Sequence, residues 1–189
     1  MEIYQHTFKD CMKRLFTVAA FALTLSGCAG PVIHHYTPSA ENVVALRSLE
    51  GKKINVGEFK DPQNRTRIGC RDGWMLLPGG EPYVDYIKNA LVSELKFADA
   101  YSASSNLIIS GELEELDSFT MKDTHWLIKL TITLSNGKSF DITEKHSYPF
   151  SFAGAVACPA AGLNFNIAVQ NVIKAIINSP EFKELVTEN

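Results

Sequence analysis

Residues 125–134 read HWLIKLTITL, and this stretch decides the fold because a large apolar residue occupies every second position. Side chains two residues apart point to the same face of a β-strand, so the pattern predicts a strand with one buried face. Asn136-Gly137 follows, the pair that a two-residue type I′ hairpin turn favours. We therefore expect a partner strand over residues 138–150, with residue 125 facing residue 148 and residue 127 facing residue 146. The apolar positions of the first strand are Trp126, Ile128, Leu130, Ile132 and Leu134.

Two further strands and a small hairpin are expected earlier in the chain. Residues 52–59 alternate and end at Asp61-Pro62, and residues 106–116 also read as a strand. The long loop between them, residues 63–80, contains Asp72-Gly73 between two short apolar pieces. This dipeptide is typical of a tight turn, so it predicts a small hairpin.

Two main helices complete the expected fold. The first begins near Pro82, which suits the first turn of a helix, and Lys88 and Glu94 lie off its apolar stripe. Residues 153–162 are small and contain Gly and Pro, so we expect a loop there and a second helix capped by Asn164. A short helix from Ser179-Pro180 follows. The order β-α-β-β-β-α predicts an α+β fold, a mostly antiparallel sheet of about four strands with two main helices packed on one face. The first stripe is Val84, Ile87, Leu91 and Leu95.

The N-terminal segment has the pattern of a secretory signal. Lys13-Arg14 precede an apolar run of eleven residues, 15–25, and small residues follow it. Eleven helical residues span about 16 Å, half of a ~30 Å hydrocarbon core, which disfavours a permanent transmembrane helix. We expect residues 1–27 to be a signal peptide, with Met12 as the true start. Residues 28–50 are then an acylated cysteine and an extended tether, and residues 51–189 are a single periplasmic α+β domain.

The string Leu25-Ser26-Gly27-Cys28 resembles the lipobox of bacterial lipoproteins. The resemblance implies cleavage before Cys28, diacylation of its thiol and usually a third acyl chain on its amine, with palmitate as a component. Two or more chains hold a protein stably on a membrane, whereas one holds it reversibly. By analogy with enterobacterial sorting, Ala29 in place of Asp favours the outer membrane, with the domain facing the periplasm.

Two cysteines remain besides Cys11, which is discarded, and Cys28, which is acylated. Cys70 and Cys158 would lie in an oxidising compartment, where a remaining pair is first interpreted as a disulfide. The alternative is two unpaired buried thiols. Neither cysteine belongs to a Cys-x-x-Cys motif, so a redox-enzyme role is disfavoured.

The composition excludes several classes of protein. A chain of 189 residues with 46% hydrophobic and 21% charged residues is neither disordered nor collagen-like. The net charge of -3 gives no basis for nucleic-acid binding. Removal of residues 1–27 leaves 15 basic and 19 acidic residues, a balance of −4, so the acyl chains must carry the attachment to the membrane.

Five short strings accompany the expected element order: Val56 leading to Lys60-Asp61, Arg71-Asp72-Gly73, Asn106-Leu107-Ile108-Ile109, Ser135-Asn136-Gly137-Lys138 and Ser179-Pro180-Glu181-Phe182. With these strings, the element order behind a lipobox resembles the YajG family of bacterial lipoproteins over residues 52–189. More distantly it is similar to the architecture of the TolB N-terminal domain and of the envelope lipoproteins CsgG, PelC and LpoB. The resemblance implies a periplasmic domain without an established catalytic site, and no functional residue is transferred from it.

No catalytic, cofactor or metal site is expected. His34-His35 are adjacent and cannot both face one ion as helical i, i+4 ligands do. His125 and His146 are at best diagonal neighbours on the predicted hairpin. A Gly-x-Ser-x-Gly motif is absent, and Glu112 and Glu114 show no acid/base asymmetry along a strand.

The loop 63–80 is the candidate partner-binding segment, because it combines three arginines with a tryptophan, types enriched at interface hot spots. The alternative is that Trp74 and Leu77 only cover the end of the core. The leading hypothesis is a non-enzymatic lipoprotein that binds or assembles with an unidentified envelope protein. The competing hypothesis is a small-ligand or lipid carrier with a pocket between sheet and helices. The candidate contact residues are Arg65, Arg67, Arg71, Trp74 and Leu77.

Overall fold

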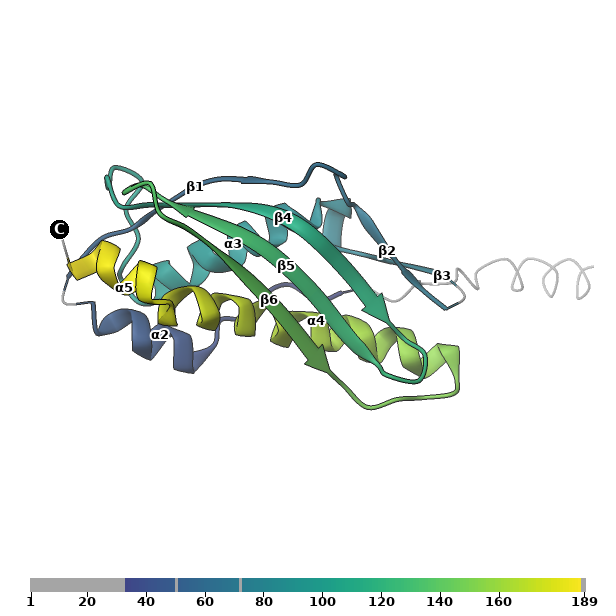
Figure 1. Cartoon of the computed structure of the whole chain (residues 1–189). Coiled ribbons are helices and arrows are strands. Elements are labelled where there is room, and N and C mark those ends of the chain that lie inside the picture. Colours follow the sequence, from purple (N-terminus) through teal and green to yellow (C-terminus); the bar gives the residue numbers. More distant parts are fainter. Residues whose placement is uncertain (1–32, 50, 72, 188–189) are drawn as a thin grey trace, which may run out of the picture.

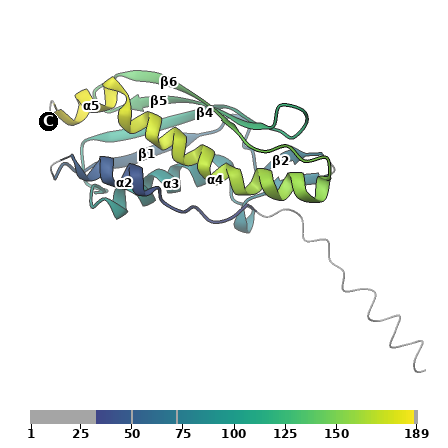
Figure 2. The ribbon, with the colours of Figure 1, turned by 90° about the horizontal axis from the view of Figure 1, so that it is seen from below.

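A four-stranded sheet forms one layer of the molecule, and the helices cover one of its faces (Figures 1 and 2). The computed structural model describes residues 33–49, 51–71 and 73–187. The strand order is β1-β4-β5-β6, with β1 parallel to β4 and the other pairs antiparallel. The predicted α+β fold with a mostly antiparallel sheet is therefore confirmed. The strands are β1 (Asn55–Lys60), β4 (Ile108–Phe119), β5 (His125–Leu134) and β6 (Ser139–Ser147).

A separate two-stranded hairpin follows β1 in the chain. Strand β2 (Arg67–Cys70) pairs antiparallel with β3 (Gly73–Leu76), and Cys70 faces Gly73 across the turn. The predicted hairpin is confirmed, but its turn lies one residue earlier than Asp72-Gly73, because Gly73 is already paired as the first residue of β3. A short 3₁₀ turn (Pro78–Gly80) connects it to the first long helix.

Four helices are present among the described residues: α2 (Ala40–Arg47), α3 (Tyr83–Phe97), α4 (Gly154–Asn178) and α5 (Pro180–Thr187). Helix α3 forms where the apolar stripe predicted it. Helix α2 was not predicted as an element, because its eight residues lack a clear stripe; the hydroxyl of Ser39 caps it by accepting from the Asn42 amide at 3.4 Å.

The core lies between the sheet and the helices. The five alternating positions of β5 are all buried, as the sequence predicts. Trp126 is fully buried, its ring centroid lies 4.7 Å from that of Phe165, and its Nε1 donates to the Ala161 carbonyl at 2.7 Å. A single hydrogen bond thus fixes β5 against α4 and satisfies the only polar atom of the indole.

A β-bulge at Glu114 keeps the apolar side of β4 facing the core. Leu113 pairs with Leu130 and Leu116 pairs with Ile128, although three positions separate the two β4 residues. If this segment were a regular strand with every residue paired, Leu116 would point to solvent, because residues three positions apart face opposite sides. The bulge places Glu112 and Glu115, rather than Glu112 and Glu114, opposite β5 residues on the outer face.

The β5–β6 turn has three residues instead of the expected two. The Gly137 amide donates to the Leu134 carbonyl, the Leu134 amide donates to Lys138, and Gly137 has φ +84°. This is the geometry of a type I turn followed by a left-handed residue. His125 therefore faces Ser147 rather than residue 148, and the predicted register was wrong by one residue.

Helix α4 begins eleven residues earlier than expected, with Ala153 instead of Asn164 as its cap, so the predicted loop at 153–162 and the Asn164 cap were wrong. Pro159 lies inside the helix, and Asn164 donates to the Ala160 carbonyl four residues back. Small residues in this stretch pack closely under β5, which outweighs the lost backbone hydrogen bond. Among the described residues, α4 is the one helix long and apolar enough to cross a membrane, and half of that window is buried in the protein.

The described part of the expected tether is packed onto the domain. Extended residues 33–39, here called the strap, contact both α3 and α4 and lead into α2 (Figure 2). The expected extended conformation is correct for residues 33–39 and wrong for residues 40–47, which form helix α2, and neither part is a free linker. Side chains of the helices bind its carbonyls: Tyr86 donates to His34, Asn166 to His35 and Gln170 to Thr37, at 3.0, 3.3 and 2.8 Å.

Candidate functional site

The β2–β3 hairpin carries most of the residues predicted to bind a partner, and its two faces differ. Ile68, Cys70 and Met75 are buried, with β2 lying against β4. Strand alternation then directs the intervening residues to the opposite, exposed face. We call this surface the hairpin face; it consists of Arg67, Gly69, Trp74 and Leu76.

An exposed cation–π pair dominates the hairpin face. The guanidinium carbon of Arg67 lies 4.5 Å from the ring centroid of Trp74, whose side chain remains 51% exposed. Gly69 faces Trp74 across the hairpin, and the indole passes 3.9 Å from the position that a Cβ would occupy there. A half-exposed tryptophan held flat in this way presents a preformed apolar surface with a charged edge.

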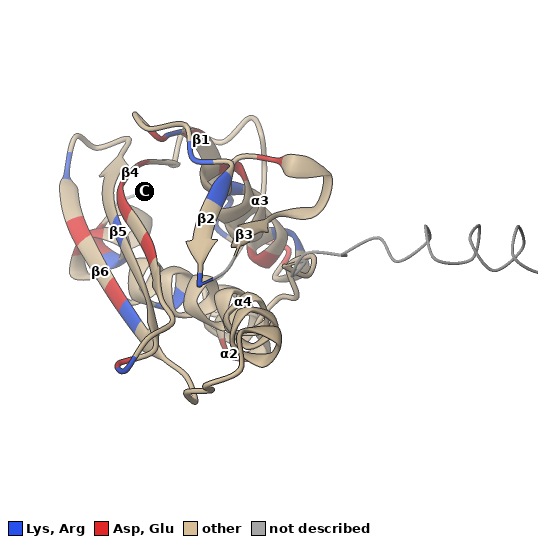
Figure 3. Cartoon of the chain, turned by 90° about the vertical axis from the view of Figure 1, so that its right-hand side faces the viewer, with Lys and Arg blue, Asp and Glu red and all other residues tan. Residues whose placement is uncertain are grey.

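A shallow, open groove of about 310 Å³ separates the hairpin face from β4. Arg67 and Trp74 line one side, and Glu114, Glu115 and Asp117 line the other. Figure 3 shows this contrast as basic residues on β2 and acidic residues on β4. A groove with opposite charges on its two sides and an aromatic ring suits a polypeptide segment better than a simple anion or cation.

Arg65 holds the fold together, which corrects its prediction as a partner-binding residue. Its Nη1 lies 2.6 Å from Asp61 Oδ1 and donates to the Leu113 carbonyl at 3.2 Å, and its Nη2 donates to the Glu114 carbonyl at 2.9 Å. Only a tenth of the side chain is exposed. Arg65 therefore fastens the turn after β1 to the bulge of β4.

Arg71 connects three loops at the tip of the hairpin. Its Nε and Nη2 donate to the Thr120 carbonyl at 3.1 and 2.9 Å, and its Nη1 donates to the Phe152 carbonyl at 2.5 Å. The guanidinium carbon lies 5.2 Å from the ring centroid of Phe150. These contacts occupy the guanidinium, so Arg71 positions the loops around it rather than offering a free charge to a partner.

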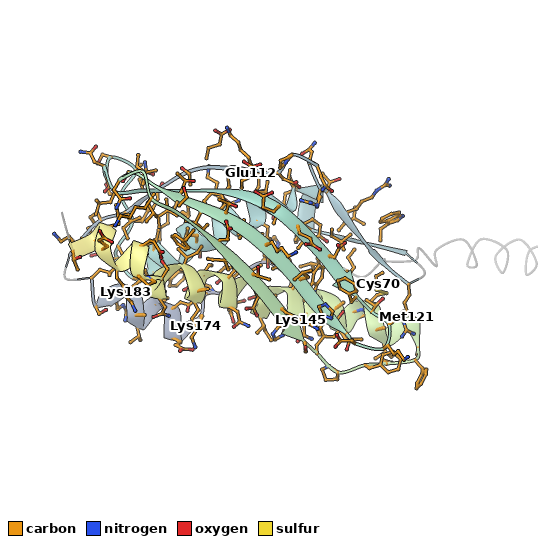
Figure 4. The ribbon with its side chains drawn as sticks, in the orientation of Figure 1. Cys70, Glu112, Met121, Lys145, Lys174 and Lys183 are labelled. Carbon is orange, nitrogen blue, oxygen red and sulfur yellow. A yellow bond between two sulfur atoms is a disulfide. The ribbon has the colours of Figure 1, made fainter. Side chains whose placement is uncertain are left out.

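The predicted disulfide between Cys70 and Cys158 is confirmed. The two Cα atoms lie 5.8 Å apart across a sequence separation of 88. The bond fixes the last residue of β2 to the first turns of α4, at the end of the molecule where Figure 4 labels Cys70. The hairpin, which is too small to be stable alone, is thereby attached to the main core.

The sequence left open whether Trp74 and Leu77 bind a partner or cover the core, and the structure buries Leu77 and leaves Trp74 exposed. Leu77 is 3% exposed and belongs to the core, which corrects its prediction as a contact residue. Trp74 is half exposed. Leu76, which belongs to the predicted binding loop but was not among its candidate contact residues, is exposed opposite Arg67 on the hairpin face.

The histidines do not converge. His125 stacks on Phe119 at 4.4 Å between ring centroids, whereas the His146 Nε2 contacts Asn164 Oδ1 at 3.1 Å on the helix side of the sheet. The corrected register places His146 opposite Trp126, so the two histidines point to opposite faces. Within the described ranges, no group of three metal-ligating side chains is present. Cys28 lies outside the described residues.

The space between sheet and helices is filled by side chains, where the competing hypothesis needs a ligand pocket. Trp126, Phe165, Tyr83 and Ile87 are fully buried there. Tyr83 and Phe165 meet edge to face, with ring centroids 5.2 Å apart. A carrier would have to displace these close-packed rings to admit a ligand, so nothing in this region favours the carrier hypothesis.

Glu94 is a residue whose role the sequence did not reveal. It is fully buried, and its Oε1 accepts from the Tyr36 hydroxyl at 2.5 Å, the Ser39 amide at 2.8 Å and the Asn42 side chain at 3.3 Å. Its Oε2 is buried without a hydrogen-bond partner in the described part of the chain. Burial, together with the bond to Glu94, raises the pKa of Tyr36 well above its usual value. One carboxyl group thus fastens the strap and α2 to α3.

Comparison with known proteins gives the fold and no activity. No protein-family model matches the sequence, and no curated protein matches it. A Xanthomonas campestris protein assigned to family model DUF330 shares the fold, with a TM-score of 0.56, 14% sequence identity and coverage of 83% of this chain and 95% of that chain. A PelC dodecamer from Paraburkholderia phytofirmans gives a TM-score of 0.34 and 17% identity, covering 64% of this chain and 87% of that chain. That second similarity is too slight to support a statement about this chain.

Proposed function

We propose that this chain is a non-enzymatic lipoprotein, anchored by acyl chains on Cys28, that binds an envelope protein through the hairpin face. Its domain faces the periplasm from the outer membrane. The observation that carries the binding role is the exposed Arg67–Trp74 pair on a hairpin fixed to the core by a disulfide. Tryptophan and arginine side chains of this kind dominate binding energy at protein interfaces.

The disulfide also supports the proposed compartment. A bond between Cys70 and Cys158 persists in oxidising environments such as the periplasm and is rare in the reducing cytosol. The lipobox at Cys28 supplies the route to that compartment and the attachment to its membrane. Labelling cells with radioactive palmitate tests this part: wild type should incorporate label and a Cys28→Ala variant should not. Equal incorporation in both would refute the anchor.

Pre-organisation explains why this face suits binding. The hairpin face is fixed by the Cys70–Cys158 bond and by the Arg71 contacts, so little conformational entropy is lost when a partner docks. The mixed charges of the adjacent groove provide orientation, since Arg67 lies on one side and Glu114 on the other. Trp74 supplies the apolar contact.

Site-specific photo-crosslinking in cells tests the binding role. A photoreactive residue in place of Leu76 should form one discrete adduct with an envelope protein, and the same residue in place of Phe97 should form none. Phe97 is a matched control because it is 63% exposed and lies outside the hairpin face. Adding Trp74→Ala should remove the Leu76 adduct, since loss of a hot-spot residue weakens binding by roughly thirty-fold.

The folded state should survive that substitution, because Trp74 is half exposed and an exposed cation–π pair contributes only about 0.5–1 kcal/mol. The thermal midpoint of Trp74→Ala should therefore stay within a few degrees of wild type. An adduct that persists without Trp74 would contradict the proposal. If Trp74→Ala lost both the adduct and its thermal stability, Trp74 would instead be a residue that stabilises the core.

A further inference from the structure

Four exposed apolar side chains gather at the end of the molecule that contains the hairpin tip. Phe152 is 89% exposed, Met121 69%, Val156 55% and Phe150 40%, and the two phenylalanine rings have centroids 4.7 Å apart. Figure 4 shows Met121 beside Cys70 at this end. We call these four side chains the apolar end. Exposed apolar surface of this kind marks an interaction site more often than chance.

The apolar end is held in place by the contacts at the hairpin tip. Arg71 binds the carbonyl of Thr120, the residue before Met121, and the carbonyl of Phe152 itself. The disulfide joins the hairpin to Cys158, two residues after Val156. The apolar side chains therefore project from loops that are fixed relative to one another.

This end is also less acidic than the rest of the chain. Residues 154–173 contain no charged side chain, and Figure 3 shows this half of α4 facing the viewer without a basic or acidic residue. Segments 71–73, 120–124 and 145–158 together carry three basic and two acidic residues, a balance of +1. The chain after residue 27 has a balance of −4, so its negative charge lies elsewhere.

The strap shows in which direction the chain leaves the domain. From His35 to Thr37 its partner on α4 changes from Asn166 to Gln170, so the strap runs parallel to α4. Followed backward, this direction leads toward the beginning of α4, where Val156 lies.

The length of chain before the strap allows Cys28 to reach the apolar end. Twelve helical residues separate Asn166 from Gly154, which is about 18 Å along α4. Seven residues separate His35 from Cys28, and seven residues span at most about 23–25 Å. Acyl chains on Cys28 can therefore enter a bilayer in the plane of the apolar end.

We propose that the apolar end is a second membrane contact, in which Phe152, Met121 and Val156 enter the phospholipid surface beside the lipid anchor. The inference rests on the proposed acylation of Cys28. The anchor keeps the domain at a high local concentration near the bilayer, so a small apolar area is sufficient for lasting contact. Lys122, exposed next to Met121, lies where it can meet a lipid phosphate.

Quenching of tryptophan fluorescence by brominated lipid tests this contact in the full-length acylated protein. The protein is reconstituted in vesicles of phosphatidylethanolamine with a minor share of phosphatidylglycerol, with or without bromine on the acyl chains. A Trp74→Phe background leaves fully buried Trp126 as a constant signal. Phe152→Trp and Met121→Trp report from the apolar end. Phe97→Trp, at the far end of α3, is the matched control.

Emission of the Phe152→Trp and Met121→Trp variants should shift to the blue in vesicles and be lost in brominated ones, while emission of the Phe97→Trp variant should change in neither. An acylated protein whose Phe152→Trp emission is not quenched would overturn the inference. The inference would also be overturned if the Phe152→Trp side chain became buried by self-association of the protein in detergent and was not quenched by brominated lipid. The apolar end would then be a contact between two copies of this chain. The intact mass of each sample separates the two proposals, because a mass without acyl chains refutes the anchor itself.

Discussion

Removing the disulfide by the double substitution Cys70→Ser and Cys158→Ser should lower the free energy of unfolding by about 3 to 4.6 kcal/mol. Loop closure in the unfolded chain sets the upper value: with 88 positions between the cysteines, the chain-entropy relation gives about 4.6 kcal/mol at 25 °C. The lower value applies if the unfolded chain is compact. For a domain of this size, either value corresponds to a fall of roughly 10 °C in the midpoint of thermal unfolding.

The loss should be greatest at the hairpin, because its remaining attachments are few. They include the buried side chains of Ile68 and Met75, the Tyr83 hydroxyl bond to the Met75 carbonyl at 3.0 Å, the Ile33 amide bond to the Leu76 carbonyl at 3.4 Å, and the Arg71 contacts. Denaturant unfolding of oxidised wild type, reduced wild type and the double variant measures the global effect. Hydrogen exchange of the β2 and β3 amides measures the local effect. Reduced wild type should match the double variant, and the double variant itself should be insensitive to reductant. Phe97→Ser, which keeps the disulfide, should lose as much stability on reduction as wild type does.

Two results would refute this reasoning. A change below about 1 kcal/mol would mean that the unfolded chain is already constrained, or that the Arg71 contacts make the disulfide redundant. Faster exchange spread evenly over β4, β5 and the hairpin would mean that the bond stabilises the whole core. Either outcome would remove the argument that the hairpin face is pre-organised by this bond.

Two other predictions concern the strap and the buried tyrosines. Glu94→Ala should lower the free energy of unfolding by about 2 to 4 kcal/mol, because three donors of the strap and α2 lose their acceptor. Unfolding in urea measures this change, and Lys88→Ala on the same helix should change the free energy little. Burial raises the pKa of Tyr36, Tyr83 and Tyr86, so the folded protein retains phenolic protons that the unfolded chain loses. The contribution of these tyrosines to stability should therefore be constant below about pH 10 and fall as pH rises beyond it. Tyr36→Phe should reduce the slope in the alkaline range; an unchanged slope would contradict the assignment.

Periodicity was sufficient to predict the parts of the fold that bury one regular face. The alternation around Ile128 predicted β5, and the apolar stripe through Leu91 predicted α3, because burial of one face stabilises each of these elements. Asp72-Gly73 indicated a hairpin at the correct place in the chain, although its turn begins at Arg71, whose φ is +37°, and Gly73 pairs with Cys70. In each case the conformation that the local sequence favours is also the conformation that the tertiary structure requires.

Elements that depend on distant partners could not be predicted in this way. Helix α4 passes through Pro159 because β5 packs on it, and no local rule predicts a helix across a proline. Glu94 lies off the apolar stripe, yet it is buried because the strap, more than fifty residues away, covers it. The β-bulge at Glu114 could not be predicted either, because it follows from the tertiary requirement that Leu113 and Leu116 both face the core.

The candidate site followed the same division. Residue type singled out Arg67 and Trp74, and the structure places these two side chains together as an exposed pair on the hairpin. Type alone could not show that the Arg65 guanidinium is used by backbone carbonyls, or that Leu77 is one position out of phase with the exposed face. Exposure is decided by strand register, which the sequence of a short hairpin specifies only weakly.

The docked strap changes what an acyl anchor on Cys28 would do. A free tether of some twenty residues would let the domain rotate and explore a wide zone above the membrane. With the strap fastened from Ile33 onward, only five residues separate the anchor from the domain, a reach of at most about 18 Å. The strap then selects the end of the domain that faces the bilayer. The hairpin face lies close to that end, because β3 extends only about 10 Å from Leu76 to the hairpin tip. A partner that binds Trp74 would accordingly have to be a membrane protein, or lie close to the membrane surface.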